Sequence, residues 1–432
     1  MVGIVWLTVM TTATVALPPD VSLDEAMRLF DAGSYDQAVV VFDRVIRAEP
    51  SNIRALYYRG EAHRKSWRLT EAEKDFARVI QLDPRHASAH LARGLIFEYK
   101  AYADRAASDY AAATRLDSKL PLPWIYHGRY LWRRGEMEKA TADLNRGIEL
   151  CNQKIAANSN DLQAYRARAL AYNALEQYDR AIDDYGQMIR IDPKSVEAYI
   201  ERGRSCVKKN DKFASVADFD QAIKLATSLI MVQPGNDQVL RYRVEAYDAR
   251  AFAWKDPNDF ARAIIDCEAL LTRSPNCATL YFRRGHLLAG ASHFSGDPVS
   301  AARQFSQAEK DLGQTIKLDR TFAAAWHERG LLYLRAALRQ QQPKMALRGV
   351  KDLTEMVKLV PNAALAYCAR GSAYGLAGNY RLALADFDKA VQLCPKLADA
   401  HALRSGANLA LGNDAAAQAD MARANELRTR RR

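Results

Sequence analysis

The segment Ala55–His63, ALYYRGEAH, followed by Ala72–Pro84, AEKDFARVIQLDP, decides the fold of this chain. Four positions of the first segment lie at i, i+3, i+4 and i+7 and therefore share one helical face: Leu56, Arg59, Gly60 and His63. The second segment shows the same periodicity at Ala72, Phe76, Val79 and Ile80. Pro84 cannot continue a helix and closes the unit. The pair predicts a helix-turn-helix in which small residues let the two helices approach closely.

The unit recurs with a period of 34 residues, as the steps from Gly60 to Gly94 and from Gly94 to Gly128 show. Other clear copies of the first segment are AHLARGLIF (89–97), AYIERGRSC (198–206) and AYCARGSAY (366–374). A fixed period of this size indicates a repeat array rather than a set of globular domains. We count eleven units, whose small first-helix residues are Ala26, Gly60, Gly94, Gly128, Ala169, Gly203, Ala251, Gly285, Gly330, Gly371 and Ser405.

The pattern resembles the tetratricopeptide repeat (TPR) family: a small residue midway in the first helix, a small residue and then an aromatic in the second, and a closing proline. The resemblance covers nearly the whole chain and implies an all-α, right-handed α-solenoid whose concave face binds proteins. It implies no reaction. We assign residues 19–432 to the array, with insertions near 149–160, 224–240, 290–304 and 338–347, and residues 1–18 to a separate apolar segment.

A charged pair accompanies ten of the units. An arginine precedes the small first-helix residue, with His127 in one unit, and an aspartate precedes the aromatic site of the second helix. The first unit lacks both members. This co-occurrence favours an Arg–Asp brace inside each unit over a row of ligand-binding arginines. The expected pairs are Arg59–Asp75, Arg93–Asp109, His127–Asp143, Arg168–Asp184, Arg202–Asp218, Arg250–Asp266, Arg284–Asp311, Arg329–Asp352, Arg370–Asp386 and Arg404–Asp420.

The opposite face of each first helix should line the concave groove, because equivalent faces align in a solenoid. The middle of that face is basic with embedded aromatics, and it predicts one continuous surface for an acidic, extended partner. Trp132 is the expected hot spot. The alternative is a solvated mixed surface. The candidate partner-binding residues are Tyr57, Arg64, Tyr126, Arg129, Trp132, Arg133, Arg166, Arg204 and Lys208.

Farther along the chain the groove face turns apolar and predicts contact with an apolar partner segment. The residues concerned are Leu331, Leu334, Leu365, Leu376 and Leu409. The Lys/Asn/Arg carboxylate clamp of chaperone-tail-binding TPR members does not carry over, because the matching sites hold Glu61, Leu95, Arg129, Leu170 and Arg204.

Charge and termini leave alternatives open. The formal net charge of +11 could attract nucleic acid, but no strand-binding pattern is present, so dedicated nucleic-acid binding is not favoured. Residues 1–16 carry no charge and resemble a secretory signal that lacks its basic start. Export or anchoring is favoured slightly over the alternative, an apolar extension that covers the first unit. Any membrane contact would occur only through this N-terminal segment. The arginines after Glu426 form either a solvated tail or a contact for an anionic surface, and Asn425 marks a polar, terminating last unit.

No catalytic motif is present, and the six cysteines form no C-x-x-C pair. Cys206 and Cys267 fall on packed helix positions and are expected to be small buried hydrophobes. The sequence therefore predicts no enzyme, metal or cofactor. It predicts a protein-interaction scaffold, with an exported envelope-assembly factor or a charge-driven nucleic-acid-associated protein as alternatives. The sequence does not indicate which partner or process is involved.

Overall fold

The computed structural model describes residues 22–429, which form 22 α-helices and contain no β-strand. Residues 1–18, assigned above to a separate segment, and residues 430–432 lie outside the described part. The helices are α1 (Leu23–Asp31), α2 (Tyr35–Ala48), α3 (Ile53–Lys65), α4 (Leu69–Leu82), α5 (Ala87–Tyr99), α6 (Ala103–Leu116), α7 (Pro121–Arg133), α8 (Met137–Ala157), α9 (Leu162–Ala174), α10 (Tyr178–Ile191), α11 (Val196–Lys209), α12 (Lys212–Val232), α13 (Asp237–Trp254), α14 (Pro257–Arg273), α15 (Ala278–Phe294), α16 (Pro298–Leu318), α17 (Ala323–Gln340), α18 (Pro343–Leu359), α19 (Ala364–Leu376), α20 (Tyr380–Leu393), α21 (Ala398–Ala410) and α22 (Asp414–Thr429).

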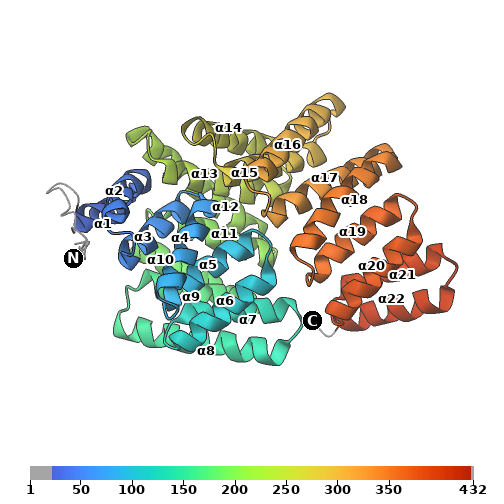
Figure 1. The fold of residues 1–432 in the computed structure, drawn as a ribbon, viewed down its shortest axis with the longest axis horizontal. Coiled ribbons are helices and arrows are strands. Elements are labelled where there is room, and N and C mark those ends of the chain that lie inside the picture. The colour runs from blue at the N-terminus through green and yellow to red at the C-terminus, as the bar shows by residue number, and fades with distance from the viewer. Residues whose placement is uncertain (1–21, 430–432) are drawn as a thin grey trace, which may run out of the picture.

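Consecutive helices pack as hairpins, and the hairpins stack side by side into a curved solenoid (Figure 1). We call the odd-numbered helices A helices and the even-numbered ones B helices. A Cβ atom at Gly60 would lie 2.8 Å from the Phe76 ring, and one at Gly94 would lie 2.6 Å from the Tyr110 ring. The small residues are therefore needed for the close approach of each A helix to its B helix, as the sequence predicted. No described helix is both long enough and apolar enough to cross a membrane.

Nine of the ten predicted charged pairs form within their hairpins. In eight of them the guanidinium group donates to both carboxylate oxygens of a buried aspartate; the ninth is the His127–Asp143 contact at 2.6 Å. Some braces also reach the preceding hairpin: Arg59 donates to Asp43 at 2.8 Å and Arg404 to Asp388 at 3.0 Å. These arginines therefore connect neighbouring hairpins as well as the two helices of one hairpin.

The predicted pair between Arg250 and Asp266 is wrong. Asp266 accepts two hydrogen bonds from Arg243, at 2.8 and 2.7 Å, whereas Arg250 donates to Asp259 at 2.6 Å. The reason is helix length: α13 has 18 residues and α14 has 17, against 13 and 14 in α3 and α4. Arg243 is the seventh residue of α13, as Arg59 is of α3. The longer hairpin therefore contains a second Arg–Asp pair two helical turns nearer its tip.

The other long helices show where extra residues lie. Residues 149–157 continue α8 and residues 224–232 continue α12, and both helices reach 21 residues. In the hairpins α15–α16 and α17–α18 both helices are long. These hairpin tips extend beyond their neighbours at the upper edge of the molecule in Figure 1.

The solenoid curls back on itself, so that hairpin turns from its first part contact loops between hairpins in its second part. We call this contact zone the seam. The helices α3–α5 accordingly lie beside α13–α15 in Figure 1. Hydrogen bonds across the seam join Cys277 Sγ to the Trp67 carbonyl, Tyr102 Oη to the Thr321 carbonyl, Cys394 Sγ to the Arg134 carbonyl and Lys396 Nζ to the Gly135 carbonyl.

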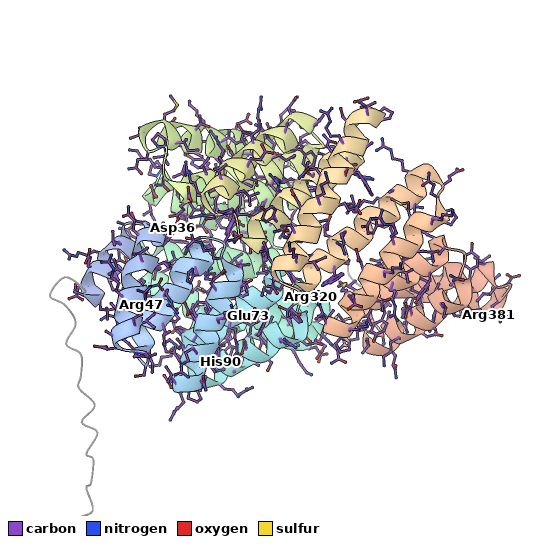
Figure 2. The ribbon with its side chains drawn as sticks, turned by 45° about the horizontal axis from the view of Figure 1, so that its top comes forward. Asp36, Arg47, Glu73, His90, Arg320 and Arg381 are labelled. Carbon is purple, nitrogen blue, oxygen red and sulfur yellow. The ribbon has the colours of Figure 1, made fainter. Side chains whose placement is uncertain are left out.

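A buried lysine lies at the centre of the seam. Lys100 is 1% exposed and forms ion pairs with Glu73 at 2.6 Å and with Asp319 at 2.7 Å. Thr70 donates a further hydrogen bond to Asp319 at 2.9 Å. Figure 2 shows Glu73 facing the end of α16, which the label of Arg320 marks. The first and second parts of the solenoid are thus held together by buried charged groups.

The seam also changes the interpretation of the apolar groove residues. Leu334 is buried, and Leu331 and Leu376 pack into the same cluster, which includes Phe97 and Tyr102 from the first part of the chain. The prediction that all five leucines offer a free apolar surface is therefore wrong for these three. Only Leu365 and Leu409 remain largely exposed. At the end of the array, Asn425 is exposed, as expected for a polar terminal helix.

Candidate partner-binding groove

The inner face of the solenoid contains a cavity of about 630 Å³ between α7, α9, α11 and α13. Because the A helices lie side by side, side chains from four consecutive hairpins meet in this cavity. Its basic lining consists of Arg129, Arg133, Arg204 and Lys208. Aromatic and apolar lining comes from Trp132, Leu170, Tyr178, Val207, Phe219 and Phe252, and the acidic lining is Glu176 and Glu201.

Five of the nine predicted groove residues line this one cavity: Arg129, Trp132, Arg133, Arg204 and Lys208. Tyr126 lies directly beside it, because the Arg129 guanidinium group stacks over its ring at 5.1 Å. Arg64 and Arg166 both lie near Tyr126, and the positive charge of Arg166 acts to lower the pKa of Arg64. Tyr57 packs among Tyr58, Phe76 and His86, and it is not among the residues that line the cavity.

Most of the cations in the groove already have carboxylate neighbours within the chain. Arg133 forms an ion pair with Glu98 at 2.9 Å, and Arg129 lies 3.6 Å from the same carboxylate. Arg204 pairs with Glu201 one turn earlier on α11. A partner carboxylate would therefore exchange with Glu98 or Glu201 rather than meet isolated cations.

Farther along the groove, Arg64 pairs with Glu61 at 2.7 Å and Arg166 with Glu197 at 3.0 Å. A partner carboxylate would compete with Glu61 and Glu197 for these two arginines.

Lys208 is exposed at the edge of the cavity and forms no ion pair among residues 22–429. Enclosure by the cavity walls lowers its pKa, and the positive charges of Arg129, Arg133 and Arg204 lower it further, whereas Glu201 acts in the opposite direction. A lysine held against three guanidinium groups gains free energy when an anion binds beside it. This repulsion makes the Lys208 end of the cavity its most electropositive part.

Trp132 forms part of the apolar wall of the cavity. It packs against the cluster that contains Leu144, Leu170 and Ala174 and keeps part of its surface free. On the facing wall, the Phe252 ring stacks on His286 at a centroid distance of 4.7 Å. Two aromatic side chains thus flank a cationic surface, an arrangement that suits a segment with alternating acidic and apolar groups.

Sequence reasoning missed the contribution of α13. Ala249, Phe252 and Ala253 line the cavity, and the last two belong to the part of α13 that extends beyond the 13 residues of α3. The signal was present in the sequence, since Arg243 stands seven residues before Arg250. Phe252 also follows the small residue Ala251 as Arg129 follows Gly128, but it was not assigned to the groove.

No group of three or more His, Cys, Asp or Glu side chains within residues 22–429 is arranged to hold a metal ion. All six cysteines are buried and unpaired. Burial raises the pKa of Cys151 and of Cys267 to about 12, which disfavours the reactive thiolate.

Comparison with known proteins agrees with this architecture. Tetratricopeptide repeat models match residues 23–85, 162–195 and 364–397. The human mitochondrial import receptor subunit TOM70 is 25% identical over 259 residues, which cover 59% of this chain and 38% of that protein. Stress-induced-phosphoprotein 1 of Caenorhabditis elegans is 23% identical over 199 residues, 45% of this chain and 59% of that protein. The chain thus spans 38% of the length of the import receptor subunits it matches.

Solved structures of TPR proteins overlap this chain only loosely. YrrB, described as a TPR protein with an unusual peptide-binding site, is 18% identical; the match covers 46% of this chain and 96% of YrrB, with a TM-score of 0.26. A TPR protein from Parabacteroides merdae is 19% identical, covering 65% and 98%, with a TM-score of 0.34. Superpositions this loose add no argument about function.

The stacked hairpins, their small-residue contacts and the inner cavity define a helical repeat protein of the α-solenoid class. The matches in three separate parts of the chain identify its repeats further: they are tetratricopeptide repeats.

Proposed function

We propose that this chain is a non-enzymatic interaction scaffold that holds an acidic, extended segment of a partner protein in its groove. The observation that carries the proposal is the cavity in which Arg129, Arg133 and Lys208 surround the partly exposed Trp132. Carboxylates of a partner can exchange with Glu98 for the arginines, and an apolar side chain can pack on Trp132. The resemblance to an import receptor subunit and to a stress-induced phosphoprotein supports a role in protein interaction.

An extended segment fits better than a globular surface because the cations come from several A helices along the solenoid. Arg64, Arg129 and Arg204 belong to α3, α7 and α11, so that the positive charge continues along the solenoid. Charge complementarity of this kind contributes mainly to association rate and specificity. Binding should therefore weaken as the salt concentration rises.

The test is quantitative affinity capture with mass spectrometry, comparing the intact chain with the variant Arg129→Gln, Arg133→Gln, Lys208→Gln. The matched control is Arg47→Gln, Lys224→Gln, Arg381→Gln, which removes the same charge from exposed positions on the B helices α2, α12 and α20. Figure 2 shows Arg47 and Arg381 far apart on the outside of the molecule.

We expect the intact chain and the control variant to capture the same acidic partners, and the groove variant to lose them. Equal loss in both variants would indicate attraction by net charge alone, including attraction of nucleic acid. Partners retained by the groove variant would show that they bind elsewhere on the solenoid.

A further inference from the structure

A second cavity, of about 390 Å³, lies at the seam, between the turn that joins α1 to α2 and the loop that joins α12 to α13. Residues 32–37 form one wall, and residues 233 and 235–238 together with Arg241 form the other. Figure 2 marks the place with Asp36, where the first hairpin meets the second part of the solenoid. This cavity is separate from the partner-binding groove.

Arg241 is an unpaired cation inside the protein. It is 6% exposed, and its Nε atom has no hydrogen-bond partner within residues 22–429. Burial lowers the pKa of Arg241, and the negative charges of Asp237 and Asp36 offset only part of that effect. A buried charge without a partner costs several kcal/mol in general, so proteins retain one mainly where something binds it.

The two nearby carboxylates are engaged with other arginines. Asp36 forms its ion pair with Arg68 at 2.9 Å, and Asp237 forms its ion pair with Arg273. Three arginines and two aspartates thus leave one positive charge uncompensated around the cavity. Arg243, two residues along the same helix, shows the ordinary arrangement, since it makes two hydrogen bonds to Asp266.

The N-terminus of α2 independently favours an anion at the same place. The first turn of α2, at Tyr35, Asp36 and Gln37, lines the cavity. Its N-cap residue, Ser34, makes no side-chain capping hydrogen bond, whereas Asn236 caps α13 with its own side chain. The first amide groups of a helix have no intrahelical acceptor and lie at the positive end of its dipole, so they bind anions readily.

We propose that this cavity is a binding site for a small oxyanion, a carboxylate or a phosphate, held between the Arg241 guanidinium group and the first turn of α2. The planar guanidinium fork suits two oxygens of such a group. A bound oxyanion connects the first hairpin to α13 and thereby strengthens one end of the seam. Occupancy of this site would thus control how firmly the first hairpin is held.

The experiment measures the melting temperature of the full chain by scanning calorimetry while sodium acetate or sodium phosphate replaces sodium chloride at constant ionic strength. Isothermal titration calorimetry with the same two salts gives the stoichiometry. We expect a saturable rise of about 2–4 °C with at least one of the two ions and one site per chain. A response to acetate alone identifies a carboxylate site, and a response to phosphate alone identifies a phosphate site.

Two variants make the test specific. Arg241→Met should melt no lower than the unmodified chain in chloride, because it removes an unpaired buried charge, and it should show no rise with either ion. The control Arg243→Met should melt lower but keep the full rise. The proposal is overturned if Arg241→Met retains the rise, if it melts as low as Arg243→Met, or if the unmodified chain shows neither a saturable rise nor binding heat with both ions.

Discussion

The partner of Asp266 offers the sharpest test of how the longest hairpins are aligned. The structure pairs this aspartate with Arg243, whereas the repeat pattern alone pairs it with Arg250. Asp266 is 4% exposed and accepts two hydrogen bonds from one guanidinium group. The change Arg243→Met leaves that carboxylate buried without its cation. Because the Arg243 side chain is 20% exposed and water can reach part of the site, we expect the lower end of the usual range, a loss of about 3 kcal/mol.

The assay is a double-mutant cycle that combines each arginine change with Asp266→Asn and measures the free energy of unfolding in urea. The account predicts a coupling of about 2 kcal/mol between Arg243 and Asp266, because the second change removes the stranded charge. For Arg250→Met combined with Asp266→Asn it predicts additivity within about 0.5 kcal/mol, since Arg250 donates to Asp259 and Asp220 instead. Strong coupling of Asp266 to Arg250 and none to Arg243 would refute the assignment.

Three further predictions concern stability. Gly285→Val should lower stability by about 1–3 kcal/mol in urea unfolding, because even a Cβ atom there would lie 2.9 Å from a neighbouring leucine; an unchanged midpoint would contradict the close helix contact. Lys100→Met should lower the free energy of unfolding by about 3 kcal/mol, because it leaves Asp319 buried without its cation. Amide hydrogen exchange should then increase on both sides of the seam. An increase on one side only would argue against the seam. Glu328 is buried, which raises its pKa, but the contact with His286 and the nearby positive charges outweigh this and bring the pKa to about 2. The ionised Glu328 therefore stabilises the folded chain above its ordinary pKa of about 4.5, and this stabilisation is lost as the pH falls toward 2. Between pH 5 and pH 3, the free energy of unfolding of Glu328→Gln should therefore fall by less than that of the unmodified chain. Equal decreases in the two proteins would contradict this assignment.

Much of the fold follows from local sequence because each hairpin repeats the same contacts. Gly60 opposite Phe76 and Arg59 opposite Asp75 are separated by only 16 residues, and such short-range pairs depend on helix geometry alone. The error at Arg250 has the same origin. A two-turn extension of the hairpin places a second arginine in an equivalent position, and the sequence pattern alone does not decide between the two alignments.

The seam could not be predicted in this way. Lys100 and Asp319 are 219 residues apart, and whether they meet depends on the small rotation added by every hairpin between them. Leu334 therefore looked like a groove residue, although it is buried in a cluster that also contains Phe97 and Tyr102 from the first part of the solenoid. The Arg241 cavity was missed for the same reason, because its two walls come from α1–α2 and α12–α13.

The groove could be predicted in part, because it depends on contacts between neighbouring hairpins rather than within one hairpin or across the seam. Arg129, Trp132 and Arg133 are on one helix, and their alignment with Arg204 and Lys208 follows from the stacking of neighbouring hairpins, and these five residues line one cavity. Their partners Glu98 and Glu201 were not predicted, although each lies within reach of its arginine through simple helix periodicity or stacking. Which proteins bind there is a matter for experiment.

The most direct test of the central claim, that the cavity around Trp132 holds the partner, is site-specific photo-crosslinking. A photoreactive phenylalanine derivative is placed at position 132 in one sample and at exposed Leu365 in another, and both are irradiated in the presence of cell extract. The account predicts that position 132 crosslinks to acidic segments of partner proteins, that this labelling decreases with rising salt, and that position 365 does not give the same products. Partners labelled from position 365 but never from position 132 would contradict the claim and place the binding surface elsewhere.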